Sequence, residues 1–131
     1  DSVIPWTTYT DPEVARVGLN EEQAGDELSV YALPASEVDR FRTEGYDKGM
    51  IKLVTDGDDV AGVTAIMPRA GEALQEFILA KEHGISVDEV ADIVHTYPTM
   101  ADANKWVAYE HVQEKITPFV KTMAQWMFKL F

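Results

Sequence analysis

The sequence has no cysteine, few basic residues and no long apolar run. The lack of cysteine excludes a disulfide framework, a thiolate zinc site and a cysteine nucleophile within these 131 residues. Against 11 basic residues stand 23 acidic ones, and the resulting net charge of −12 argues against binding to nucleic acid or to an anionic membrane. Because no run of about 18 apolar residues occurs, no membrane span is expected.

The residues that are present have the composition of a folded protein. Apolar residues make up 46% and charged residues 26%, and the length suits one domain. The chain opens with Asp1-Ser2-Val3. It does not begin with Met, and no basic segment followed by an apolar one, as in a signal peptide, stands at its start. We therefore expect a piece cut from a longer chain, without a signal peptide and with a cytoplasmic location.

Alternating β-branched and aromatic residues predict strands in the first half of the chain. The predicted strands cover residues 3–9, 12–17, 28–33, 50–55 and 60–67, with a short helix at 20–24 and one or two helical turns at 36–41. Turn-forming residues at 56–59 predict a hairpin. Pro5 places its strand at an edge or a strand start, and Gly62 indicates a bulge or a close neighbouring backbone.

Helical spacing replaces alternation after Ala70. We expect helices at 70–84 and 86–94, a further helix that opens near Thr99 and continues past Val112, and a last helix from about Pro118, a residue favoured in first turns. Strands followed by helices predict an α+β fold, an antiparallel sheet of about four to five strands with helices packed on it.

The segment His95-Thr96-Tyr97-Pro98-Thr99-Met100-Ala101-Asp102 is the main candidate for chemistry. If residues 95–97 are extended, His95 and Tyr97 point the same way. Pro98 keeps Tyr97 extended, and we predict a cis bond between them. Thr99 and Asp102 can cap the next helix. The alternative is a buried aromatic residue, a turn proline and a capping pair without chemistry.

The other two histidines do not form a predicted site. His83 precedes a helix-ending glycine and suits the negative end of the helix dipole. His111 is expected to be solvated on a helix. No metal site is predicted, because nothing local brings the histidines together.

Four stretches in order resemble the C-terminal dimerisation domain of the flavin-dependent pyridine nucleotide-disulfide oxidoreductases, which include glutathione reductase, dihydrolipoamide dehydrogenase and mercuric reductase. Residues 6–19 are similar to the family's Phe-Thr-x-Pro-Glu-x-Ala-x-Val-Gly, and 49–53 to Gly-Phe-x-Lys-Leu. Residues 62–72 are similar to Gly-x-x-x-x-Gly-x-x-Ala-x-Glu. Residues 95–99 are similar to His-x-His-Pro-Thr, which a Glu follows five residues after the second His.

The resemblance implies a homodimer in which this domain completes the active site of the partner subunit. The FAD and NAD(P) domains, and the redox-active cysteine pair, would precede this segment in the full-length enzyme. The domain alone would then be inactive and bind neither cofactor. By the same resemblance, His95, Tyr97 and Asp102 are the candidate catalytic residues, and the backbone of Tyr97 and Pro98 would lie near the partner's flavin.

The sequence departs from the family at two positions. Tyr97 stands where the catalytic His belongs and Asp102 where its Glu belongs. A phenol with a pKa of ~10 accepts protons poorly near neutrality, but it can donate a hydrogen bond to a substrate or a thiolate. The Tyr-Pro-Thr motif most closely resembles mercuric-reductase-like members, although the sequence has no terminal cysteine pair. The resemblance therefore implies the function of a fragment of a disulfide or metal-ion oxidoreductase. The alternative is a purely structural oligomerisation module that has lost its catalytic dyad.

We expect a dimerisation domain, residues 1–112, and an amphipathic helical extension of that domain, residues 113–131, which lies beyond the roughly 3–110 that the resemblance covers. Apolar side chains repeat at three- and four-residue spacing in the extension: Ile116, Phe119, Val120, Met123, Met127 and Leu130, with Trp126 and Phe131 adjoining. We expect this stripe to pack on the domain or on its dimer mate. Binding to a membrane surface is the alternative, but only Lys115, Lys121 and Lys129 supply positive charge, which is little for that role.

Overall fold

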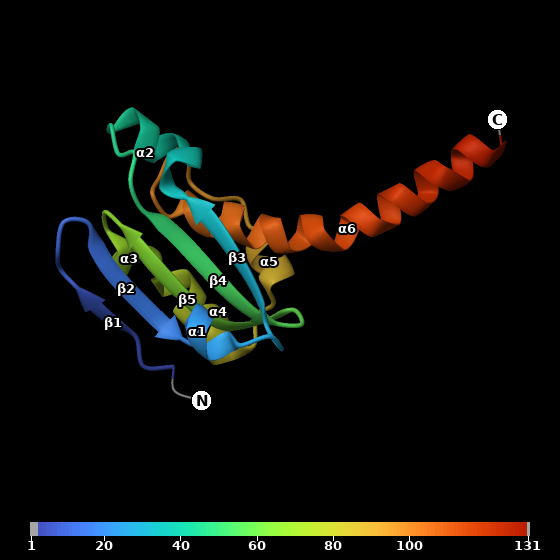
Figure 1. Ribbon diagram of the computed structural model, residues 1–131. Helices are drawn as coiled ribbons and strands as arrows, with labels where there is room; N and C mark the ends of the chain where they lie inside the picture. The colour runs from blue at the N-terminus through green and yellow to red at the C-terminus, as the bar shows by residue number, and fades with distance from the viewer. Residues whose placement is uncertain (1–2, 131) are drawn as a thin grey trace.

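The computed structural model describes residues 3–130 as a five-stranded sheet with helices (Figure 1). The strands are β1 (Trp6–Thr8), β2 (Glu13–Gly18), β3 (Ser29–Pro34), β4 (Met50–Asp56) and β5 (Asp59–Met67). The helices are α1 (Glu21–Ala24), the 3-10 turn η1 (Ala35–Glu37), α2 (Asp39–Thr43), α3 (Ala70–Ala73), α4 (Gln75–His83), α5 (Val87–Asp92) and α6 (Asp102–Leu130). The predicted α+β class is confirmed.

The sheet is antiparallel throughout, in the order β1-β2-β5-β4-β3. The predicted hairpin joins β4 and β5, with Asp56 opposite Asp59. β1 is an edge strand, as Pro5 predicts, but it is shorter than the predicted 3–9 because proline lacks the N–H that pairing requires.

The two faces of the sheet have different covers. α3, α4 and α6 pack on one face and α5 packs against α6, so that the main core lies between these helices and the sheet. Phe77 of α4 and Leu53 of β4 are fully buried there. On the other face α1 covers one end, where Ala24, Val54 and Ala61 form a small second core. At the far end of this face Met50 and Ile66 are partly exposed.

Gly62 is required by a close backbone approach. A Cβ at this position would lie 2.0 Å from the carbonyl oxygen of Leu19, which no neighbouring side chain movement could relieve. Gly18, its partner across the β2–β5 ladder, has a φ of +68° and faces the carbonyl oxygen of Ala61. The predicted close neighbouring backbone is confirmed, and a register irregularity lies next to it between Val54 and Thr55.

The helical half differs from the prediction at two places. The single helix expected over 70–84 is divided at Leu74 into α3 and α4. The prediction of two helices around Pro118 is wrong, because α6 runs without a break from Asp102 to Leu130. Pro118 removes one backbone donor in a fully exposed turn, and the helical hydrogen bonds on either side continue.

α6 leaves the rest of the molecule part-way along its length (Figure 1). We call residues 3–112 the body and residues 113–130 the arm. Up to Val112 the helix contributes side chains to the core, whereas every arm side chain described is exposed except the half-buried Ala124. The expected packing of the stripe on its own domain is therefore wrong for the described arm residues, and Phe131 and the side chain of Leu130 lie outside the described part. None of the helices in residues 3–130 is long and apolar enough to cross a membrane.

Candidate functional site

The loop between α5 and α6 carries the candidate catalytic residues His95 and Tyr97, and the third, Asp102, is the first residue of α6. The backbone turns extended at Ile93, after the last residue of α5. The Tyr97–Pro98 peptide bond is cis, as predicted. The Thr99 hydroxyl donates to the carbonyl oxygen of Thr96 at 2.8 Å, so the loop closes on itself before α6 begins.

His95 is anchored to the body by both ring nitrogens. Nδ1 lies 3.0 Å from the carbonyl oxygen of Ile93, and Nε2 lies 3.0 Å from Oε2 of Glu76 on α4. The amide of Asn104 donates to the same carboxylate oxygen at 2.9 Å and to the carbonyl oxygen of Ala73 at 2.7 Å. The side chain of His95 is only 9% exposed. It therefore joins the loop to α4 and α6.

Tyr97 lies at the surface and has a different partner. The residue is 65% exposed, and its hydroxyl donates to Oδ2 of Asp39 on α2 at 2.5 Å. The hydrogen bond to the Asp39 carboxylate raises the pKa of Tyr97 above its ordinary value, because an ionised phenol would face a like charge. Tyr97 is thus a protonated donor at neutral pH.

Asp102 is buried in the first turn of α6, with 5% of its surface exposed. Its Oδ2 accepts from the indole N–H of Trp106 at 2.9 Å, within the same helix. The carboxylate that binds Tyr97 is instead Asp39, which lies 58 positions earlier in the chain. No local motif could have indicated this pair, since only the fold brings α2 beside the loop.

A cleft of about 340 Å³ opens beside this loop. It is lined by Thr99, Met100, Ala101 and Ala73, with Arg40, Arg69 and Glu72 supplying its charges. Arg40 also binds Glu44, and Glu72 is an acidic residue of the lining, so the cleft is polar without a strong charge of one sign.

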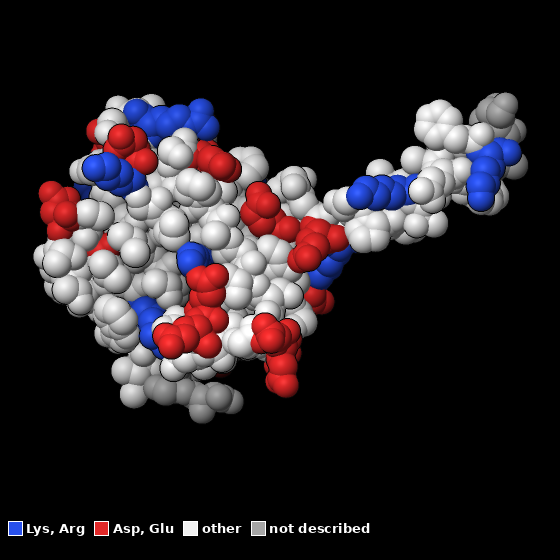
Figure 2. Space-filling model, viewed as in Figure 1, with Lys and Arg blue, Asp and Glu red and all other residues white. Residues whose placement is uncertain are grey.

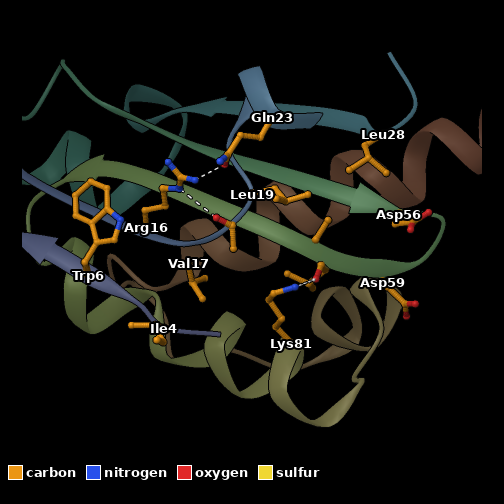
Figure 3. Close-up of a pocket in the computed structure, with 13 residues that line it drawn as sticks. Ile4, Trp6, Arg16, Val17, Leu19, Gln23, Leu28, Asp56, Asp59 and Lys81 are labelled. Atoms are coloured by element: carbon orange, nitrogen blue, oxygen red, sulfur yellow. Dashed lines mark hydrogen bonds between the residues drawn. The ribbon is translucent and has the colours of Figure 1, made fainter. Parts of the chain in front are cut away.

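A second cavity, of about 540 Å³, lies at the opposite end of the sheet between β1, β2, β5 and α4 (Figure 3). Two basic side chains point into it. Arg16 donates to the carbonyl oxygen of Gly18 at 3.1 Å and also binds Gln23, and Lys81 donates to the carbonyl oxygen of Val60 at 3.4 Å. Both cations bind backbone or a neutral amide of their own chain, so this cavity shows no reactive pair of groups.

The base of the arm carries a polar cluster that the sequence did not predict. His111 is buried, and the expectation that it is solvated is wrong: Nε2 lies 3.1 Å from Asp58, and Nδ1 lies 3.2 Å from the Tyr31 hydroxyl. Asp58, Asp88 and His111 are close enough to hold a cation together. The ammonium group of Lys115 already binds both carboxylates, and its hydrogen bond lowers the pKa of Asp58. The cluster therefore ties α6 to the body.

The sequence profile of the pyridine nucleotide-disulphide oxidoreductase dimerisation domain matches residues 4–108. The chain belongs to this family. The mitochondrial dihydrolipoyl dehydrogenase of Schizosaccharomyces pombe is 38% identical over 107 residues, which are 78% of this chain and 21% of that protein. The dihydrolipoyl dehydrogenase of Halobacterium salinarum is 34% identical over 113 residues, 82% of this chain and 24% of that protein.

A solved structure shows the same fold. The HOCl-induced flavoprotein disulfide reductase RclA of Escherichia coli, in a Cu(II) complex, superposes with a TM-score of 0.78 at 22% identity, over 83% of this chain and 26% of that one. The chain thus spans about a fifth to a quarter of the length of these relatives. The profile match ends at residue 108, before the arm begins.

Proposed function

We propose that this chain is the dimerisation and active-site-completing domain of an FAD- and NAD(P)-dependent oxidoreductase that acts on a disulfide or a metal ion. The observation that carries the proposal is the exposed Tyr97–Pro98 loop, held from behind by the bond between His95 and Glu76. A loop fixed in this way presents Tyr97 outward, toward a partner. Residues 1–112 would be the domain itself and 113–131 its helical extension.

Support for a homodimer comes from apolar side chains around this loop. The exposed ones are Ile93, Val94, Tyr97, Trp106 and Tyr109, with 39% to 91% of each residue exposed. Such a patch on a small acidic domain suits an interface between two copies. The patch surrounds Tyr97, so a partner subunit bound to it would bring its active site within reach of Tyr97.

The described residues are better suited to contacting a cofactor bound by the partner subunit than to binding a cofactor themselves. Dinucleotides are bound at the Gly-rich turn of a parallel βαβ unit, and the sheet described here is antiparallel. Tyr97 and Pro98 would instead approach the flavin of the partner subunit from the outside. Bound FAD would carry electrons between NAD(P)H and the substrate. A cytoplasmic location stays a prediction.

Tyr97 would act as a hydrogen-bond donor. Its raised pKa keeps the phenol protonated at neutral pH, and Asp39 fixes the direction of the ring and its hydroxyl. The hydroxyl could turn from Asp39 to a thiolate or another anionic group of the partner's site. His95 would position the loop through Glu76, and Asp102 would support it through Trp106 and the first turn of α6.

The relatives named as dihydrolipoyl dehydrogenases favour a dithiol as the substrate. Similarity to mercuric reductases, suggested by the Tyr-Pro-Thr motif, remains a hypothesis for which a metal ion would be the substrate. Assays of the full-length enzyme with dihydrolipoamide and with Hg(II) separate the two substrate classes.

The decisive variant is Tyr97→Phe in the full-length enzyme. Loss of a donor that acts in the transition state should lower kcat about a hundredfold, while reduction of the flavin by NAD(P)H is unchanged. Tyr9→Phe, on an exposed tyrosine of the body, is the matched control. Full turnover in Tyr97→Phe with a dimer intact would contradict the active-site role and leave the structural module as the function.

A further inference from the structure

The arm concentrates exposed apolar surface in a way that the body does not. Large apolar side chains on it are about half exposed or more: Ile116, Phe119, Val120, Met123, Trp126, Met127 and Phe128. Most of them recur at three- and four-residue spacing, so that they line one side of the helix. Nothing in the described chain covers that side.

The charge of the arm is opposite to that of the body. Residues 1–112 carry eight basic and 22 acidic residues, a net charge of −14, whereas residues 113–131 carry three lysines and one glutamate. Figure 2 shows the arm beyond its first turns in white and blue, without red. The overall charge of −12 therefore conceals a cationic helix, and it is no argument against an anionic surface for this segment.

We propose that the arm is an interfacial helix that binds the surface of an anionic lipid bilayer. A helix with Trp, Phe and Met on one side, and with lysines outside that side, lies in the headgroup region with its apolar side toward the acyl chains. At 3.6 residues per turn, Lys121 and Lys129 fall outside the apolar stripe, on the other side of the helix. From there they can face lipid phosphates. Trp126 is suited to the boundary between headgroups and acyl chains.

Repulsion between the body and the lipid does not prevent this contact. The arm is roughly 27 Å long at 1.5 Å per residue, and charges are screened within about 8 Å at physiological ionic strength. The acidic groups nearest the arm are also engaged. Lys115 binds Asp58 and Asp88, and Glu114 accepts from Tyr31.

A second copy of the arm is a poorer occupant. Two arms bring together two segments that each carry three lysines against one glutamate. The stripe covers only about two heptads, and its flanking positions hold Phe119 and Trp126 in place of the charged pairs that specify coiled coils. Charge complementarity therefore favours an anionic lipid surface over a second arm.

The test is flotation of the full chain with vesicles of phosphatidylcholine alone, or with about one third phosphatidylglycerol. Binding is expected only to the vesicles with phosphatidylglycerol and should weaken at high salt. Each lysine in the headgroup region strengthens binding about fivefold, so Lys121→Gln with Lys129→Gln should weaken it about 25-fold. Lys48→Gln, on an exposed lysine of the body, should bind as the wild type does.

Tryptophan emission locates the contact. Phosphatidylglycerol vesicles should shift the emission to shorter wavelengths, and Trp126→Phe should abolish most of the shift while the chain still floats. Trp6→Phe, on β1, should retain the shift.

Three outcomes would overturn the proposal. The first is failure to float with either vesicle, and the second is equal flotation with both, without an effect of salt. The third is self-association of the chain without lipid that Trp126→Ser abolishes and Tyr9→Ser does not, which would assign the stripe to a second copy.

Discussion

The body and the arm share one helix but are stabilised differently. In the body, α6 packs on β3, β4 and α5, and Val107 and Ala108 are fully buried. In the arm, Glu114 and Lys115 bond to the body at its base, and beyond them the helix depends mainly on its own hydrogen bonds, since the described side chains are exposed or, at Ala124, half-buried. An isolated helix of this length is marginal in water. The apolar side of the arm therefore lacks, within the described residues, the kind of packing partner that stabilises α6 in the body.

The largest expected difference concerns a phenylalanine in each region. Phe77→Ala removes a fully buried ring from the core and should lower the free energy of unfolding by about 3–5 kcal/mol. Phe119→Ala, on the arm, should change it by less than about 0.5 kcal/mol. Urea denaturation followed by circular dichroism measures both. Comparable losses would mean that the arm belongs to the cooperative fold.

The next effect is at the root of α6. Asn104→Ala removes the buried bonds to the carbonyl oxygen of Ala73 and to Glu76, and it should cost about 1–3 kcal/mol of unfolding free energy. Gln125→Ala, at an exposed position of the arm, is the control and should cost almost nothing. If the two variants were equally stable, the network that holds His95 would contribute nothing to the fold.

Local patterns in the sequence were sufficient for most of the sheet. Alternation located its strands, and Gly62 correctly indicated a close backbone, because both signals depend on neighbours in the chain or the ladder. The prediction failed at Pro118, where a residue that usually begins helices lies inside one. An exposed turn tolerates the missing donor, and sequence alone does not show how exposed that turn is.

For the candidate site, the conformation of the loop was predictable but the partners of its side chains were not. The motif located the loop and its cis proline, and the structure bears out both. The bonds of His95 to Glu76 and of Tyr97 to Asp39 join residues 19 and 58 positions apart, and only the packed fold brings them together. The burial of His111 was missed for the same reason, since Asp58 and Tyr31 reach it from the sheet.

The junction between the two regions should respond to pH. Lys115 holds the pKa of Asp58 below its ordinary value of 3.8, so this contribution to stability is present above that value and is lost as the pH falls through the lower folded-state pKa. Asp58 in turn raises the pKa of Lys115 above 10.5, and that contribution is lost only as the pH rises through the raised value.

Thermal unfolding of the wild type and of Asp58→Asn checks this prediction. The difference in Tm should be present where the Asp58 carboxyl is ionised and should close in acid below about 3.8, because the wild-type carboxyl is then protonated as well. Asp11→Asn, in the turn between β1 and β2, is the control and should show no such closing. A gap that persists at the lowest pH would place the stabilising contact elsewhere.

The smallest expected change in stability is that caused by deleting most of the arm. Removal of residues 116–131, with Lys115 retained, deletes 16 residues but none of the described core, so the free energy of unfolding should change by less than about 0.5 kcal/mol. Lys115→Met changes a single side chain, yet it breaks the bonds to Asp58 and Asp88 and removes the ammonium charge from between two neighbouring carboxylates. We therefore expect the one substitution to lower Tm by more than the deletion does. The reverse order would mean that the arm contacts the body after all, and its apolar stripe would then have a partner within its own chain.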